Sequence, residues 1–173
     1  MKRGIRSAVA ACLFSLPVAA AAPSEYEVKA AFLFNFSKFV EWPEGTFAGP
    51  GSPIVICVLG ENPFGRLLED AVRGKQVNGR ELEVRQLATS TAGCQIVFVA
   101  ASESAKEVFG KLSEEPVLTV SDGESAAERG AIIGLTLDEN RVRFEVNLVA
   151  ARKAGLKLSS QLLKVAVRLI GRF

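Results

Sequence analysis

Three short runs of apolar, mostly β-branched residues recur along the chain and limit the folds open to it. They read IVICVLG at 54–60, CQIVFVA at 94–100 and PVLTVSD at 116–122. Such near-continuous apolar runs are typical of strands buried on both faces of a sheet. Helix-like segments at 62–74 and 102–115 separate the runs. Alternation of strand and helix predicts a mostly parallel sheet with helices on both faces.

The pattern changes in the segment AIIGLTLDENRVRFEVN at 131–147, which indicates antiparallel strands. Two strand-like runs surround Asp138-Glu139-Asn140. The second run alternates, which predicts a hairpin with one buried and one solvated face. Val142, Phe144 and Val146 are the inward residues, and Arg141, Arg143 and Glu145 are the outward ones. The outward row is a candidate partner surface, and the alternative is an ordinary solvated strand face.

Two helix-like segments follow the hairpin, at 148–155 and 159–173, and an Asn78-Gly79 turn precedes a strand that ends at Leu87. The complete pattern predicts an α/β fold. We expect a Rossmann-like, mostly parallel sheet with helices on both faces and an antiparallel hairpin near the C-terminus.

The segment SEYEVKAAFLFNFSKFVEWP at 24–43 concentrates aromatic residues in one predicted helix. Ser24 and Glu27 form a capping-box pattern, and Pro43 ends the helix. One apolar stripe is expected to face the sheet; it comprises Val28, Ala31, Phe32, Asn35, Phe36, Phe39 and Val40. Residues off the stripe, namely Leu33 and Phe34, together with Trp42, are candidates for contact with a second subunit or a partner. A ligand cage is an alternative to this core helix.

The N-terminus has the features of a signal peptide. Basic residues in MKRGIRS precede a short apolar run and the small residues AAAA at 19–22. We expect residues 1–21 to be removed, leaving a single α/β domain at 22–173 in the periplasm. An alternative is a lipoprotein cleavage box, VAAC, ending at Cys12. Removal of the leader leaves 18 basic and 19 acidic residues, a net charge of about −1, and therefore no nucleic-acid footprint.

Two cysteines remain after removal of the leader, Cys57 and Cys94. An even number in an oxidising compartment predicts one disulfide. Two buried thiols are the alternative, because free cysteine is often buried.

The chain contains no histidine, which restricts its chemistry. Ser-His-Asp and Cys-His nucleophile pairs and histidine-based zinc sites are excluded. We therefore expect a protein that is not an enzyme and that uses no cofactor or metal.

Polar residues follow two of the predicted parallel strands, where open α/β sheets bind ligands. Gly60 and Asn62 lie in GENPFG, and Ser121 and Asp122 lie in TVSDGES. The first segment lacks a nucleotide-binding glycine pattern. These four residues form a candidate cleft for a small-molecule sensor or solute-binding module. The alternative is that both segments are ordinary turns that lead into helices.

The ordered set of segments resembles the YfiR family of periplasmic proteins. The resemblance begins with EYEVKAAFLFNFSKFVEWP and continues through VLGENPFG, CQIVFVA, VLTVSD and RVRFEVNLVAARKAGLKLSSQLLKVA. It implies a Rossmann-like fold and a periplasmic repressor that binds the sensor domain of an inner-membrane diguanylate cyclase. It also implies homodimers, sequestration by an outer-membrane peptidoglycan-binding lipoprotein, and a redox input.

Cys57 and Cys94 fall where the YfiR family has one of its disulfide pairs. A second pair, found near the later hairpin in some members, is absent here, because that stretch reads AIIGLTL. The resemblance therefore supports redox control through one pair only.

Overall fold

The computed structural model describes residues 22–87, 89–102 and 104–171, so the predicted signal peptide lies outside the described residues. An eight-stranded sheet has the order β10-β8-β7-β6-β5-β2-β4-β3, and β1 and β9 form a small second sheet. The strands are β1 Val40–Glu41, β2 Ile54–Leu59, β3 Gln76–Val77, β4 Arg80–Leu87, β5 Ile96–Val99, β6 Leu118–Ser121, β7 Ile133–Asp138, β8 Arg141–Asn147, β9 Lys157–Leu158 and β10 Arg168–Ile170. The helices are α1 Glu25–Lys38, α2 Leu67–Val72, α3 Ala105–Lys111, α4 Leu148–Lys153 and α5 Ser160–Val165.

The central strands are parallel, which confirms the predicted fold class. β4, β2, β5, β6 and β7 lie side by side in this order and all run in one direction. β8 pairs antiparallel with β7 and forms the predicted hairpin, in which Leu137 opposes Val142. The Asn78-Gly79 turn, with φ values of 52° and 75°, joins β3 to β4. Positive φ at both turn residues is the geometry that an Asn-Gly pair favours.

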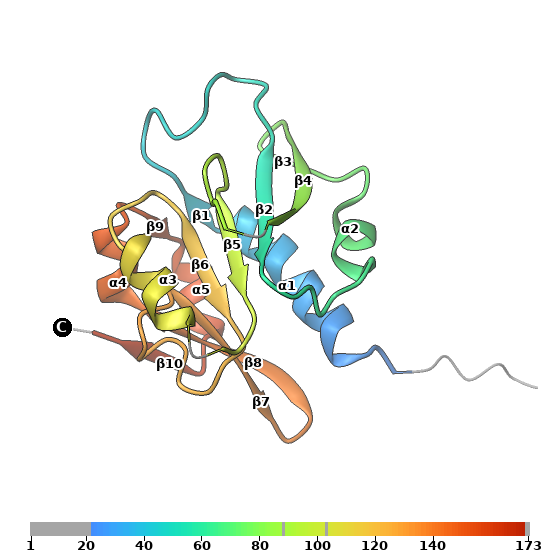
Figure 1. Cartoon of the computed structure of the whole chain (residues 1–173), viewed down its shortest axis with the longest axis vertical. Coiled ribbons are helices and arrows are strands. Elements are labelled where there is room, and N and C mark those ends of the chain that lie inside the picture. Colours follow the sequence, from blue (N-terminus) through green and yellow to red (C-terminus); the bar gives the residue numbers. More distant parts are fainter. Residues whose placement is uncertain (1–21, 88, 103, 172–173) are drawn as a thin grey trace, which may run out of the picture.

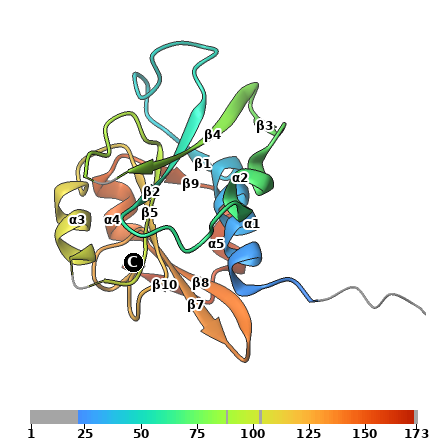
Figure 2. The ribbon, with the colours of Figure 1, turned by 45° about the vertical axis from the view of Figure 1, so that its right-hand side comes forward.

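Helices cover both faces of the sheet (Figures 1 and 2). On β2, Ile54, Ile56 and Val58 belong to the larger core with α1, α2 and α5, whereas Val55 and Cys57 belong to a smaller core under α3. This alternation is expected of a strand buried on both faces. The helices that follow β2 and β5 therefore lie on opposite faces of the sheet.

Helix α1 begins as predicted but buries only part of the predicted stripe. The Ser24 and Glu27 capping box is present. The buried residues of the helix are Lys29, Ala30, Leu33, Phe36 and Ser37. Phe36 and Val40 of the predicted stripe are buried, and Phe32 packs against the core, whereas Ala31 and Asn35 are exposed. Leu33, expected at a partner surface, is completely buried. Because the helix is apolar around much of its circumference, hydrophobicity did not determine its rotation.

The expected C-terminal helix at 159–173 was wrong for residues 166–171, because α5 ends at Val165. Ser159 caps α5, but Ala166 is extended, with φ −67° and ψ 137°. The chain then forms β10, parallel to β8, and the amide of Val167 donates to the carbonyl of Phe144 over 2.9 Å. Without β10, the backbone groups at the free edge of β8 would have no strand to pair with. A longer helix in place of β10 would leave these hydrogen bonds unformed.

Candidate functional site

The carboxyl ends of β2 and β5 form a topological switch point. The connection from β2 carries α2 on one face, and the connection from β5 carries α3 on the other. Ligands of open α/β sheets bind in the crevice at such a point. Two cavities of about 410 and 470 Å³ lie there, and both are lined by Glu61, Ala100 and Ala101. The smaller one also contacts α1.

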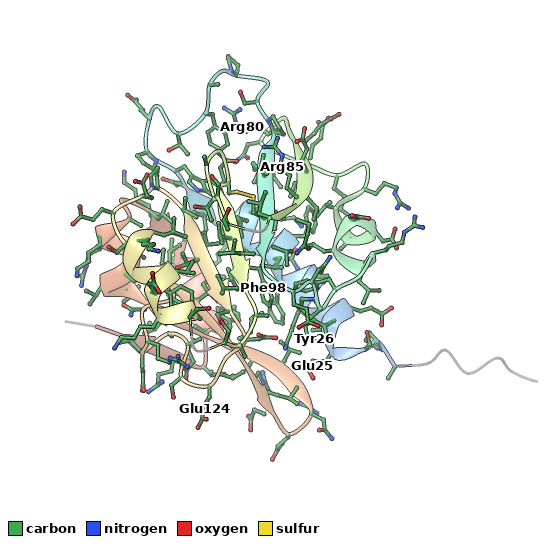
Figure 3. The ribbon with its side chains drawn as sticks, viewed as in Figure 1. Glu25, Tyr26, Arg80, Arg85, Phe98 and Glu124 are labelled. Atoms are coloured by element: carbon green, nitrogen blue, oxygen red, sulfur yellow. A yellow bond between two sulfur atoms is a disulfide. The ribbon has the colours of Figure 1, made fainter. Side chains whose placement is uncertain are left out.

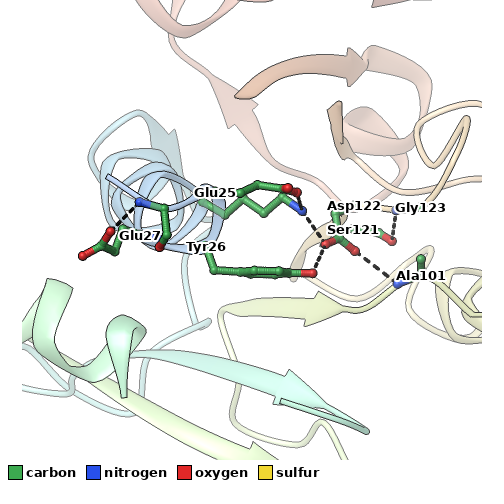
Figure 4. A network of polar contacts seen from close by, with 9 residues as sticks. Glu25, Tyr26, Glu27, Ala101, Ser121, Asp122 and Gly123 are labelled. Carbon is green, nitrogen blue, oxygen red and sulfur yellow. Dashed lines mark hydrogen bonds and ion pairs between the residues drawn. The ribbon is translucent and has the colours of Figure 1, made fainter. Parts of the chain in front are cut away.

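A buried polar network closes the α1 side of this crevice (Figure 4). Asp122, directly after β6, accepts hydrogen bonds from Lys29 Nζ at 2.7 Å and from the Tyr26 hydroxyl at 2.9 Å. Its other oxygen accepts from the amide of Ala101 at 3.1 Å. The Lys29 and Asp122 side chains are each only 6% exposed, and Lys29 also pairs with Glu25 at 2.5 Å. The network joins α1 to the ends of β5 and β6.

The network shifts the pKa values of its members. Burial, and then the hydrogen bond to the Asp122 carboxylate, raise the pKa of Tyr26 above its ordinary value. Burial alone would lower the pKa of Lys29, but its hydrogen bonds to Asp122 and Glu25 outweigh that effect and raise it. Lys29 Nζ also lies 4.4 Å from the centre of the Tyr26 ring. The protonated forms of both residues are therefore favoured in the folded protein.

The structure brings only part of the predicted cleft together. Asp122 lines the 410 Å³ cavity and Gly60 lines the 470 Å³ one. Ser121 is buried, and its hydroxyl accepts from the Gly123 amide. Asn62 holds its own turn: Oδ1 accepts from the Phe64 amide at 2.9 Å, and Nδ2 donates to the Gly65 carbonyl at 3.2 Å.

Sequence reasoning missed Tyr26, Lys29 and Glu61 as lining residues. Tyr26 and Lys29 lie one helical turn apart on α1, a spacing that any helix face contains. Their partner Asp122 is more than 90 residues away in the chain. Only a signal linking α1 to the end of β6 would have identified the cluster, and the sequence pattern contains none.

The predicted disulfide is present in the structure. Cys57 lies within β2, Cys94 lies just before β5, and their Cα atoms are 5.9 Å apart. The bond belongs to the smaller core under α3. Next to it, Gln95 makes two hydrogen bonds to Val55 of β2. The backbone amide of Gln95 donates to the carbonyl of Val55, and the side-chain Oε1 of Gln95 accepts from the amide of Val55. The turn before β5 is thus attached to β2 by one covalent bond and two hydrogen bonds.

The predicted partner residues fall on two separate surfaces. Phe144 of β8 packs on Phe32 and Phe36 of α1, so the outward row lies on the opposite sheet face from α1. Arg141 and Arg143 are exposed in this row. Glu145 is held by Arg168 of β10 through two hydrogen bonds of 2.8 Å.

The aromatic candidates are half-buried on the other side of the sheet. Two ammonium groups lie over the Phe34 ring, with Lys38 Nζ at 4.1 Å and Lys75 Nζ at 4.4 Å from its centre. Trp42 packs edge-on against Phe47 at 5.9 Å between ring centres. The indole Nε1 of Trp42 is buried without a hydrogen-bond partner among the described residues.

The fold and segment order agree with a comparison to family models. Residues 26–167 match the model of a family described as YfiR/HmsC-like. The chain belongs to the YfiR/HmsC-like family. The match includes every candidate site residue from Tyr26 to Glu145, and it confirms the resemblance drawn from the sequence.

Membership of the YfiR/HmsC-like family carries a general function. At the family level it supports a periplasmic regulator that interacts with the periplasmic domain of a diguanylate cyclase, rather than an enzyme. Within the part of the chain that the structure describes, no helix is both long enough and apolar enough to cross a membrane.

Proposed function

We propose that this protein represses an inner-membrane diguanylate cyclase by binding the sensor domain that the cyclase exposes in the periplasm. The observation that carries this proposal is the YfiR/HmsC-like match over residues 26–167, on a chain with the expected fold. Repression requires that the protein bind the inactive state of the cyclase more tightly than the active state. In this proposal the protein acts by shifting the cyclase population toward its inactive state, and it needs no catalytic group.

The exposed arginines of β8 are our candidate contact with the cyclase. Arg141 and Arg143 are exposed, and both alternate along β8 with the inward residues Val142 and Phe144. Two adjacent exposed guanidinium groups can form bidentate pairs with carboxylates of a partner. Phe34 and Trp42 remain a second proposed surface, suited to the homodimer that we also propose. An outer-membrane peptidoglycan-binding lipoprotein is a further proposed partner, which would sequester the repressor.

The direct test is the intracellular cyclic-di-GMP concentration in a clean deletion strain, its parent and a complemented strain. We expect a rise on deletion that complementation reverses. Complementation with the Arg141→Glu, Arg143→Glu double variant should fail, whereas the matched control Arg73→Glu, on an exposed arginine beyond α2, should succeed. An unchanged concentration after deletion, in several growth conditions, would contradict the repressor function.

A small-molecule sensor is the second candidate function, favoured by the two cavities at the switch point. Glu61 lines both, so Glu61→Gln is the sharper probe, because Asp122 has structural partners of its own. A compound that raises the melting temperature of the wild type should raise that of Glu61→Gln less. The absence of any stabilising compound in a broad metabolite screen would count against this function.

A further inference from the structure

The apolar face of the β7–β8 hairpin continues beyond the part that α1 covers. Leu135 and Leu137 lie on one face of β7, because residues two apart in a strand point to the same side. Leu135 opposes Phe144, which packs on α1, and is 1% exposed. Leu137, nearer the turn, opposes Val142 and is 54% exposed. The end of the hairpin therefore presents apolar surface that the fold itself leaves open.

An open cavity of about 500 Å³ lies between this end of the hairpin and the first turns of α1. Leu137 and Val142 line it from the hairpin, and Val28 and Phe32 line it from α1. Figure 3 labels Glu25, a further lining residue at the start of α1. Val28 and Leu137 lie outside both hydrophobic cores. A concave, mostly apolar surface of this volume is typical of small-molecule sites, which span about 300–1,000 Å³.

Two hydrogen-bond donors line the cavity where the hairpin turns. They are Asn140, in the turn, and Arg141, the first residue of β8. Both residues are exposed, and neither side chain has a hydrogen-bond or ion-pair partner among the residues that the structure describes. The edge of β8 beside Arg141 is also free, because β10 pairs only with Glu145–Asn147.

The one acidic residue among those that line the cavity already has a partner. The Glu25 carboxylate pairs with Lys29 Nζ at 2.5 Å. Arg141 is therefore the charged lining residue that is left without a partner in the described part of the chain. The cavity thus combines an apolar wall with one unpaired positive charge, a combination complementary to an anion that carries an apolar chain.

We propose that this cavity binds an amphiphilic carboxylate, a small molecule with an unbranched apolar chain and one anionic head group. The chain packs on Val28, Phe32 and Leu137, and burial of its methylene groups favours binding. The carboxylate accepts hydrogen bonds from the Arg141 guanidinium and the Asn140 side-chain amide. A guanidinium without partners is free to turn toward the anion, and it pairs with carboxylates in a bidentate manner.

A ligand in this cavity has a consequence for the proposed repressor. Arg141 also belongs to our candidate contact with the cyclase, so the amphiphile and the cyclase compete for one guanidinium. That consequence rests on the proposed function. The binding itself does not, because it is measured with the purified protein alone, and its failure is therefore distinguishable from a failure to repress the cyclase.

The test titrates the purified protein with decanoate in a calorimeter, below the concentration at which decanoate forms micelles. Decanol and decyltrimethylammonium are the neutral and cationic probes of the same chain length. We expect decanoate to bind about tenfold more tightly than decanol, because its head group makes charge-assisted hydrogen bonds, and the cation to bind most weakly. Octanoate should bind more weakly than decanoate, by up to about fourfold per missing CH₂. No binding of decanoate, or equal binding of the three probes, would overturn the proposal.

Four substitutions locate the site. Arg141→Gln should weaken decanoate binding about tenfold and leave decanol binding unchanged, whereas Arg143→Gln, the matched control outside the cavity, should bind both as the wild type does. Leu137→Ser should weaken both probes several-fold, whereas Val165→Ser, at an apolar residue of α5 that is 66% exposed, should change neither. All four side chains are exposed, so the fold tolerates these changes. Unchanged decanoate binding in Arg141→Gln or Leu137→Ser would contradict the assigned site.

Discussion

Asp122 is the residue on which the candidate crevice depends. It receives three hydrogen bonds, from Tyr26 and Lys29 of α1 and from the backbone after β5. A buried carboxylate with a paired ammonium contributes little net stability by itself, but removal of one partner leaves the other charge buried and unpaired. The residue is therefore first of all a structural connection between α1 and the sheet.

Replacement of Asp122 by Ala should destabilise the protein by about 3 kcal/mol, because Lys29 loses a buried partner and keeps only Glu25. Chemical denaturation of the purified protein measures this change. Glu124→Ala, two residues away at an exposed position, is the matched control and should change stability by less than about 0.5 kcal/mol. Equal effects of the two substitutions would show that the network is not structural.

Stability should decrease at alkaline pH through the same network. The pKa values of Tyr26 and Lys29 are raised in the folded state. Their contribution is therefore complete below the unfolded-state values, near 10.0 and 10.5, and is lost as the pH rises through the folded-state values. Urea midpoints between pH 8 and 11 should fall more steeply for the wild type than for the Tyr26→Phe, Lys29→Arg double variant, in which neither group titrates. Parallel curves would contradict the linkage.

At the scale of elements, strand β7 shows how closely the hairpin packs on the chain before it. Gly134 lies in β7, where a Cβ would come within 2.9 Å of the Ala127 amide nitrogen. This contact is with backbone, so a rotamer change cannot relieve it. The turn that follows Asp122 is therefore fixed against the strand that begins the hairpin.

Gly134→Ala should cost about 1–3 kcal/mol, because the added methyl group forces the backbone at Ala127 to move. Thermal denaturation provides the measurement. Gly110→Ala is the matched control: Gly110 is within α3, has open space at its Cβ position, and should gain about 0.5–1 kcal/mol. A neutral Gly134→Ala variant would show that the turn at 123–130 is free to shift.

The disulfide acts at the scale of the whole molecule, because it connects the strands on either side of the switch point. Cys57 and Cys94 are 37 residues apart, and the enclosed segment contains α2, β3 and β4. A covalent link of this length reduces the entropy of the unfolded chain. The bond thus stabilises the half of the sheet that carries the crevice.

The Cys57→Ser, Cys94→Ser double variant should lose about 4 kcal/mol relative to the oxidised protein, from loop entropy alone. Urea denaturation of both forms checks this value. The reduced wild type is the control, and it should resemble the double variant. If a redox input acts through this bond, thiols should change the cyclic-di-GMP concentration in a strain with the wild type and not in one with the double variant; a response retained by the double variant would place the input elsewhere.

The sequence alone determined those features that local chemistry dictates. Apolar runs specified β2, β5 and β6, Ser24 and Glu27 specified the start of α1, and Asn78-Gly79 specified a turn. Each depends on residues within a few positions of one another, where sterics and hydrogen bonding act without the rest of the fold.

Only the tertiary structure decided the features that depend on distant neighbours. The rotation of α1 follows from the Lys29 contact with Asp122 and from the packing of Leu33, neither visible in a helix that is apolar on most sides. Residues 168–170 form a strand because the edge of β8 is free to pair with them, although their local pattern favours a helix. Burial and edge pairing are properties of the assembled sheet, and they outweigh local propensities of less than about 1 kcal/mol per residue.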